Sequence, residues 1–377
     1  MGEKIKDLIR THSSEIDVAV SSDNRTFENN LIEDNPHLNV PKIPQSYRRY
    51  GYGLLSYFSK KVTFDWFEDF GRTNSFKSVQ SKMTNSGMSA IDLALTTLST
   101  QLGIGKIVAP RNLYFASDEL IKSYQKNIFQ EITRFDSKSD LEARIAEIEE
   151  GTILYLEMCS NSPDMSSFDE SLIRKYSGIF SYVVLDGSLI GLSRIDPSIF
   201  EYDNVIYVES LSKNYHLDDS SIVTSGIVVY SETLEEEFQK RFYCSGIYLQ
   251  LNDLMEHPTD IYGVGKDRIE KIARNVQEFY RAAKKICGGS QIAISEISDD
   301  QRKIPLVLFI DFKEKSVLSA YITSSGIPQR GSFGHNQTCI LPIGLMWDSA
   351  PPGLARLAFG KNRYSKKYLD ALSEVIK

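Results

Sequence analysis

The chain has 377 residues, with 43 lysine and arginine residues against 50 aspartate and glutamate residues, and its formal net charge is −7. This acidity argues against a general binder of nucleic acids or anionic membranes, because both kinds of binding need concentrated positive charge. With 41% hydrophobic and 25% charged residues, the composition is that of an ordinary globular protein, and the length allows two domains.

The first 60 residues are the least regular part of the sequence. They are polar, and turn-forming residues at 23–25, 35–36 and 41–44 interrupt any regular period. Segments of this kind often bind a neighbouring subunit. We therefore expect residues 1–60 to form an N-terminal arm rather than a folded domain.

Residues 61–245 alternate apolar runs of strand length with helical patterns, which is typical of a mostly parallel sheet covered by helices. Strands are expected at 106–109, 129–135, 152–157, 182–186, 205–208 and 227–230, and helices at 87–98, 117–124 and 139–149. Ligands of such sheets bind at the carboxyl ends of the strands. We therefore expect a large domain in which Glu157, Asp186 and the loop around Lys213 converge.

The pattern changes after about residue 245. One long amphipathic helix is expected at 267–287, where Ile269, Ile272 and Val276 lie on one stripe. Strands at 304–312 and 354–359 and helices at 315–324 and 365–376 are expected to follow. These elements predict a smaller α+β domain over residues 246–377.

Motifs for several other kinds of chemistry are missing from the sequence. The segment Gly103-Ile104-Gly105-Lys106 lacks the earlier Gly and the following Ser or Thr of a phosphate-binding loop, and no G-x-G-x-x-G, G-x-S-x-G or H-E-x-x-H occurs. The four cysteines form no C-x-x-C pair and show no metal-ligand spacing. No run approaches the roughly 20 apolar residues of a membrane span. We expect a cytoplasmic protein without bound metal.

A series of residues stands in a fixed order at the ends of the predicted elements: Ser86, Gly87, Met88, Tyr114, Asn161, Asp186, Ser188, Ser210, Ser212 and Lys213. In this order and spacing, the chain resembles the fold type I pyridoxal-phosphate (PLP) enzymes of the Cys/Met metabolism family, to which cystathionine γ-synthase and γ-lyase belong. The resemblance extends from about residue 70 to the C-terminus. It implies an α/β fold with a mostly parallel seven-stranded sheet in the large domain and a smaller C-terminal α+β domain.

The resemblance implies a binding site for the PLP phosphate. Ser86, Gly87 and Met88 match the family's segment at a helix N-terminus, where backbone N–H groups and the helix dipole favour a dianion. Ser210 and Ser212 match the hydroxyl residues that also bind the phosphate. Without the other motifs, an ordinary helix cap explains Ser86 and Gly87 equally well.

Three further positions match residues that contact the cofactor ring. Asp186, followed by Ser188, matches the carboxylate that keeps the pyridine nitrogen protonated and the ring an electron sink. Asn161 matches the residue that bonds to the phenolic oxygen and helps to hold the substrate. Tyr114 matches the ring that stacks on the cofactor and assists proton transfer. Taken singly, these residues read as a strand-end cap, a turn and a core aromatic.

Lys213 matches the lysine that forms the Schiff base with PLP and then removes the proton from the substrate Cα. Arg356 matches the clamp on the substrate α-carboxylate, for which a planar guanidinium is well suited. Ser332, in the segment Gly331-Ser332-Phe333-Gly334, matches the family's substrate loop.

The sequence departs from the family's pattern at several positions, two of which bear on the site. The family has an arm with the sequence Tyr-x-Arg that reaches into a neighbouring site, and Phe70-Gly71-Arg72 keeps its arginine but not its tyrosine. The resemblance implies that Arg72 binds the phosphate across a homodimer or homotetramer with shared sites. Gln337 stands where the substrate loop usually carries an acid, which indicates a divergent member, of specialised rather than housekeeping metabolism.

The resemblance implies a PLP-dependent lyase or transferase of amino acid metabolism. Its substrate would be an α-amino acid with a leaving group on the side chain, and the reaction β- or γ-elimination or γ-replacement. Transamination and decarboxylation stay open, because the sequence does not fix the torsion that selects the bond to be broken. A non-catalytic interaction protein with the same fold also stays open.

Overall fold

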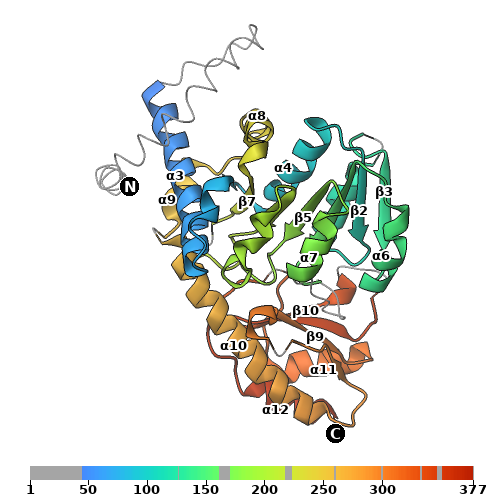
Figure 1. Cartoon of the computed structure of the whole chain (residues 1–377). Coiled ribbons are helices and arrows are strands. Elements are labelled where there is room, and N and C mark those ends of the chain that lie inside the picture. The colour runs from blue at the N-terminus through green and yellow to red at the C-terminus, as the bar shows by residue number, and fades with distance from the viewer. Residues whose placement is uncertain are drawn as a thin grey trace.

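The computed structural model describes residues 45–376 except 126, 161–169, 217–222, 259, 299, 332 and 346–349. Figure 1 shows an α/β body with a large sheet above a smaller sheet. The long helix α10 (Ile261–Cys287) runs along one side of the molecule, from the large sheet to the smaller sheet. The described part of the chain therefore contains two sheets, one above the other, with α10 alongside both.

Among the described residues, the large sheet has seven strands in the order β1-β7-β6-β5-β4-β2-β3. They are β1 (Val79–Thr84), β2 (Lys106–Pro110), β3 (Glu131–Phe135), β4 (Thr152–Glu157), β5 (Tyr182–Asp186), β6 (Val205–Glu209) and β7 (Gly226–Ser231). Strands β2 to β6 are parallel, whereas β7 pairs antiparallel with β6 and β1. The predicted mostly parallel seven-stranded sheet is confirmed.

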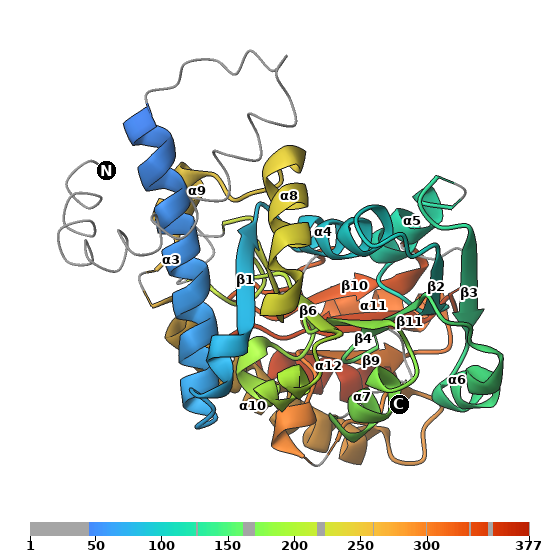
Figure 2. The same ribbon diagram turned by 45° about the horizontal axis from the view of Figure 1, so that its top comes forward.

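Helices cover both faces of this sheet, which is why its central strands are apolar throughout. They are α4 (Gly87–Thr100), α5 (Phe115–Ser123) and α8 (Glu235–Ser245) on one face, and α6 (Lys138–Arg144) and α7 (Glu170–Ser177) on the other. Figure 2 shows α4 and α5 separated by the sheet from α6 and α7. Along β5, Val184 packs in the core beneath α4, whereas Val183 and Leu185 pack in the core on the α7 side.

The structure differs from the prediction for the N-terminal arm. Residues Gln45–Asp69 form helix α3, so the predicted boundary at residue 60 falls within a helix. Trp66 of α3 is fully buried, and its Nε1 donates a hydrogen bond to the Ile195 carbonyl at 2.8 Å. The apolar stripe of α3 was hidden in the sequence because glycines and polar residues lie between its members. Residues 1–44, the rest of the predicted arm, lie outside the described residues.

The described residues of the C-terminal part form a four-stranded antiparallel sheet in the order β10-β11-β9-β8. Its strands are β8 (Ala293–Ile294), β9 (Val307–Asp311), β10 (Cys339–Pro342) and β11 (Leu354–Ala358). Helices α11 (Lys315–Ser325) and α12 (Lys367–Ile376) pack on each other, and α12 also packs on α10; the short α9 (Leu251–Glu256) precedes α10. Within the part of the chain that the structure describes, no helix has the length and apolarity that a membrane crossing requires.

Candidate active site

A cavity of about 200 Å³ lies where the loops after several parallel strands meet, as predicted from the strand ends. Ten of the residues singled out in the sequence line it: Ser86, Gly87, Met88, Tyr114, Glu157, Asp186, Ser188, Ser210, Ser212 and Lys213. Its remaining described lining residues are Ile91, Cys159, Leu189, Thr224 and Phe333. The fold thus gathers residues that are more than a hundred positions apart in sequence.

One end of the cavity is formed by the N-terminus of α4. Ser86 caps this helix, because its Oγ accepts a hydrogen bond from the Ser89 N–H at 3.0 Å. A Cβ atom at Gly87 would lie 2.5 Å from the Cβ of Ser210, so glycine lets the helix approach that segment closely. The hydroxyl groups of Ser210 and Ser212 are 2.8 Å apart beside it. Free N–H groups and hydroxyls at one place form a site for an anion.

Ser188 holds the segment that carries these hydroxyls. Its Oγ accepts a hydrogen bond from the Ser210 N–H at 3.0 Å, while its own N–H donates to Asp186 Oδ1 at 2.9 Å. Ser212 donates its N–H to the Ser225 carbonyl at 3.2 Å. The ends of β5 and β6 are therefore tied together by hydrogen bonds directly behind the anion site.

Asp186 ends β5 and turns its buried carboxylate toward the cavity. Its Oδ2 accepts a hydrogen bond from the Tyr155 hydroxyl at 3.2 Å. Burial raises the pKa of Asp186, although the hydrogen bonds from Ser188 and Tyr155 and the charge of Lys213 oppose that change. A carboxylate in this position gains stability from a cation brought into the cavity.

Lys213 lines the same cavity. Burial, reinforced by the charge of Arg356, lowers the pKa of the Lys213 amine to about 8, and Asp186 opposes the shift. A lysine with such a pKa has a substantial neutral fraction near neutral pH and can act as a nucleophile or a base. Its Nζ lies 5.1 Å from the centre of the Phe333 ring.

Tyr114 is positioned by a carboxylate at the end of β4. It is the N-cap residue of α5, and its backbone N–H donates to Glu157 Oε1 at 2.6 Å. Burial is the largest cause that raises the pKa of the Tyr114 phenol, and the charge of Arg356 opposes it. The phenol is therefore held in its protonated form at neutral pH, as a proton donor.

Arg356 approaches this group from the smaller sheet. It lies in β11, is 1% exposed, and donates a hydrogen bond to the Gly331 carbonyl at 3.0 Å. Its guanidinium carbon lies 5.8 Å from the centre of the Phe333 ring. Burial lowers the pKa of Arg356, while Tyr114 and Glu157 oppose the change, so the three groups interact electrostatically. A buried cation thus faces the residues at the strand ends.

Two predicted site residues that the structure describes, Arg72 and Arg356, are not among the residues that line the cavity. Arg72 forms ion pairs within its own chain, with Asp196 at 2.6 Å and Glu201 at 3.3 Å, and does not line the cavity. Asn161 and Ser332 lie outside the described residues. The role of Arg72 in a neighbouring site stays a prediction.

Several lining residues were not assigned from the sequence. Phe333, Leu189 and Cys159 form an apolar part of the cavity. Apolar residues give no chemical signal in a sequence, because core positions look the same. The position of Phe333 within the predicted substrate loop was the one available hint.

No protein-family model and no curated protein matches the sequence. Solved structures do match the fold. Cystathionine γ-synthase from Xanthomonas oryzae pv. oryzae, in complex with aminoacrylate and cysteine, is 16% identical, covers 85% of each chain and has a TM-score of 0.66. Methionine γ-lyase CalE6 from Micromonospora echinospora is 14% identical, with coverage of 85% of this chain and 86% of that chain and a TM-score of 0.65.

A third similar structure is that of a protein from Campylobacter jejuni assigned as an O-acetylhomoserine (thiol)-lyase. It is 17% identical, covers 85% of each chain, has a TM-score of 0.63 and carries a pyridoxyl-lysine phosphate. Identities this low establish the fold and not the activity. The chain has the fold type I architecture that the sequence motifs indicated.

Proposed function

We propose that this chain is a PLP-dependent enzyme that acts on an α-amino acid with a leaving group on its side chain, by β- or γ-elimination or γ-replacement. One observation carries the proposal: a single cavity contains the desolvated amine of Lys213, the buried carboxylate of Asp186 and an anion site at the N-terminus of α4. Bringing these three groups together does not stabilise the fold, because the burial of each polar group costs desolvation energy.

The residues present fit PLP at three of its polar groups. The phosphate dianion fits the α4 N-terminus with Ser210 and Ser212, where Gly87 leaves the necessary space. The pyridine nitrogen fits Asp186, and the aldehyde fits the amine of Lys213. When bound, PLP supplies an electron sink that stabilises negative charge at the substrate Cα.

The protein's own groups have separate tasks in this reaction. Arg356 binds the substrate α-carboxylate, and its complete burial makes that charge pairing strong. Lys213, with its pKa near 8, takes the proton from the substrate Cα and returns it. Tyr114, whose raised pKa keeps the phenol protonated, donates a proton to the departing group. Closure of the smaller sheet over the strand ends excludes water.

The similar structures support this class of reaction. A complex with aminoacrylate and cysteine is reported for the Xanthomonas protein, and the Micromonospora protein is a γ-lyase. The lysine-linked pyridoxyl group of the Campylobacter protein supports the same role for Lys213 here. We also propose a cytoplasmic homodimer or homotetramer, in which Arg72 would exchange Asp196 for the phosphate of a neighbouring site.

The absorption spectrum of the full-length protein with PLP tests the proposal. We expect a visible band that borohydride removes by fixing the cofactor to the protein, and its absence from Lys213→Ala. Lys240→Ala, which changes an exposed lysine on α8, is the matched control and should retain the band. A panel of amino acids with side-chain leaving groups then identifies the substrate by product release. A wild-type protein that binds no PLP would contradict the proposal.

A further inference from the structure

The two cationic groups of the site share one aromatic ring. The centre of the Phe333 ring lies 5.1 Å from Lys213 Nζ and 5.8 Å from Arg356 Cζ, and the ring is 9% exposed. The proposed function assigns the proton on the substrate Cα to Lys213 and the α-carboxylate to Arg356. A ring that contacts both cations must then border the space into which the substrate side chain projects.

The backbone holds this ring from both sides. On one side, the Gly331 carbonyl accepts the hydrogen bond from Arg356 at 3.0 Å. On the other, Gly334 has a φ of 91°, and a Cβ there would overlap the carbonyl of Lys213. Arg268 of α10, 1% exposed, donates to the Gly334 carbonyl at 2.5 Å. The position of Phe333 is therefore fixed before any substrate arrives.

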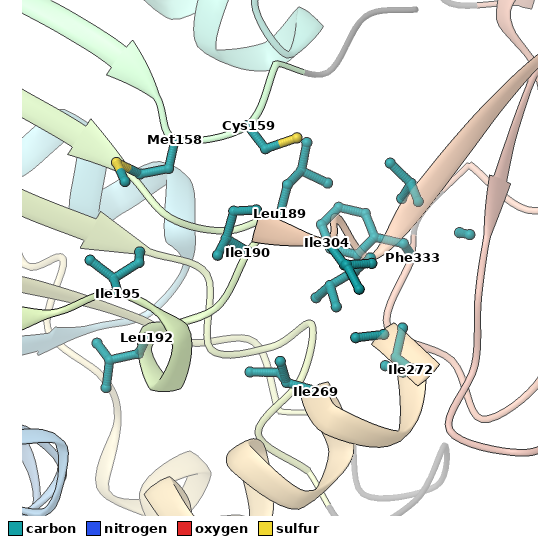
Figure 3. Packing of buried hydrophobic residues seen from close by; sticks show 14 of the residues in the cluster. Met158, Cys159, Leu189, Ile190, Leu192, Ile195, Ile269, Ile272, Ile304 and Phe333 are labelled. Carbon is teal, nitrogen blue, oxygen red and sulfur yellow. The ribbon is translucent and has the colours of Figure 1, made fainter. Parts of the chain in front are cut away.

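Two further residues continue the surface of the ring. Figure 3 shows Cys159, Leu189 and Phe333 close together, although they come from the end of β4, the loop after β5 and the C-terminal part of the chain. All three line the one cavity. We call these three residues the apolar wall. Convergence of three separate segments on one apolar surface indicates a contact surface for a ligand.

The apolar wall offers no partner to a second charged group on the substrate. A distal ammonium would lie beside the cationic Lys213 and Arg356, and no residue of the apolar wall carries an acid to pair with it. A distal carboxylate would find Arg356 already paired with the substrate α-carboxylate, and would meet the Phe333 ring and the side chain of Leu189. Transfer of either charge from water to this surface is costly without a partner.

We propose that Phe333 determines the specificity of the site, and that the substrate is an α-amino acid whose side chain carries no second charge. The inference rests on the proposed function, because it uses the assigned roles of Lys213 and Arg356. The apolar wall contacts the side chain up to its leaving group. Phe333 acts by excluding charged side chains and by packing against neutral ones.

Calorimetry on the full-length, PLP-loaded protein tests this inference with amino acids that have no leaving group. L-norleucine, L-lysine and L-2-aminoadipate have similar lengths and carry side chains of zero, positive and negative charge. We expect norleucine to bind at least about tenfold more tightly than the other two, since they must bury a charge at the apolar wall. Equal binding of all three by the wild-type protein would overturn the inference.

Two substitutions of Phe333 distinguish the contribution of the aromatic ring from that of its apolar character. Phe333→Leu should weaken norleucine binding several-fold but keep the preference for a neutral side chain, whereas Phe333→Asn should bring the three affinities close together. Phe64→Leu is the matched control, because Phe64 is 37% exposed on α3 and far from the cavity lining, and it should change nothing. A Phe333→Asn protein with unchanged selectivity would overturn the role of Phe333.

The two proposals fail in distinguishable ways. If the borohydride-sensitive band on Lys213 is present but norleucine is not preferred, the specificity inference is wrong and the proposed function stands. If the wild-type protein takes up no PLP, the proposed function is wrong. If Phe333→Asn does not fold, the wild-type comparison of the three amino acids still decides the substrate class.

Discussion

Two neighbouring strands of the large sheet each end in a buried acidic residue, and the surroundings of the two side chains differ. Asp186 ends β5 on the α4 side and lines the cavity, where it faces Lys213. Glu209 ends β6 on the other side, 1% exposed, and its Oε2 accepts hydrogen bonds from the Tyr207 hydroxyl at 2.6 Å and the Leu192 N–H at 2.8 Å. The two strands are adjacent and parallel, so the acids differ mainly in the face they occupy.

This difference decides what each acid can do. Glu209 is surrounded by donors from its own chain and cannot reach a ligand, so we expect it to stabilise the segment that leads to Lys213. Asp186 is also hydrogen-bonded but borders empty space, which allows it to pair with a cation from outside. Strand alternation by a single position thus places one acidic side chain among hydrogen-bond donors of its own chain and the other at the cavity.

The largest effect that would sharpen this comparison is expected for Asp186→Asn. The amide keeps the shape of the side chain and an acceptor for the Ser188 N–H, but its nitrogen cannot accept from the Tyr155 hydroxyl, and the neutral group cannot hold a protonated ring nitrogen. We expect a loss of about a thousandfold in kcat/KM, or ~4 kcal/mol, with unfolding free energy changed by less than about 1 kcal/mol. Steady-state kinetics with the identified substrate and urea denaturation measure the two. Full activity would show that Asp186 has no special role.

The opposite pattern is expected for Glu209→Ala. Removal of the carboxyl group leaves the Tyr207 hydroxyl without its acceptor and the Leu192 N–H with the Tyr215 hydroxyl alone, at a cost of about 3 kcal/mol in unfolding free energy. Glu209→Gln, which restores an acceptor, should lose about 1 kcal/mol. Urea denaturation followed by circular dichroism measures both. If Glu209→Ala were as stable as the wild type, the contrast between the two acids would not hold.

A smaller effect is expected in the pH dependence of stability. Burial raises the pKa of Glu209 from 4.5 to about 8. Between these values the folded chain keeps a proton that the unfolded chain has lost, so the contribution of Glu209 to stability falls as pH rises from 4.5 to 8. Glu209→Gln carries no such proton, and its unfolding free energy should fall less steeply over this window. Parallel curves for the two proteins would contradict the raised pKa.

The smallest effect on stability is expected at a third acid, which is partly exposed. Asp196 pairs with Arg72, whose side chain is 34% exposed, so Arg72→Ala should cost less than about 1 kcal/mol in unfolding free energy. If Arg72 also binds the phosphate in a neighbouring subunit, the variant will bind PLP more weakly. Thermal unfolding and PLP titration separate the two roles. Unchanged PLP affinity would leave Arg72 as a surface ion pair alone.

The sequence predicts the fold and the site where the apolar pattern of a strand ends in a residue with recognisable chemistry. Strands β4, β5 and β6 are continuous apolar runs that end in polar residues, so both the sheet and the convergence of Asp186 and Lys213 could be predicted. The surroundings of Glu209 could not, because they depend on Leu192 and Tyr207 meeting through tertiary packing. Helix α3 was missed since its buried residues, such as Trp66, are separated by polar ones. The role of Phe333 requires contacts across two sheets, which no local pattern records.

Gly87 and Gly334 bear on how far this sequence can diverge while the fold is kept. Both bring backbone directly against the segment that holds Ser210 and Lys213, one from α4 and the other from the C-terminal part of the chain. The shape of that segment is therefore specified by main-chain contacts at two points rather than by its side chains. Substitutions between those points change chemistry without changing shape. The fold itself is kept at 14–17% identity to the similar structures.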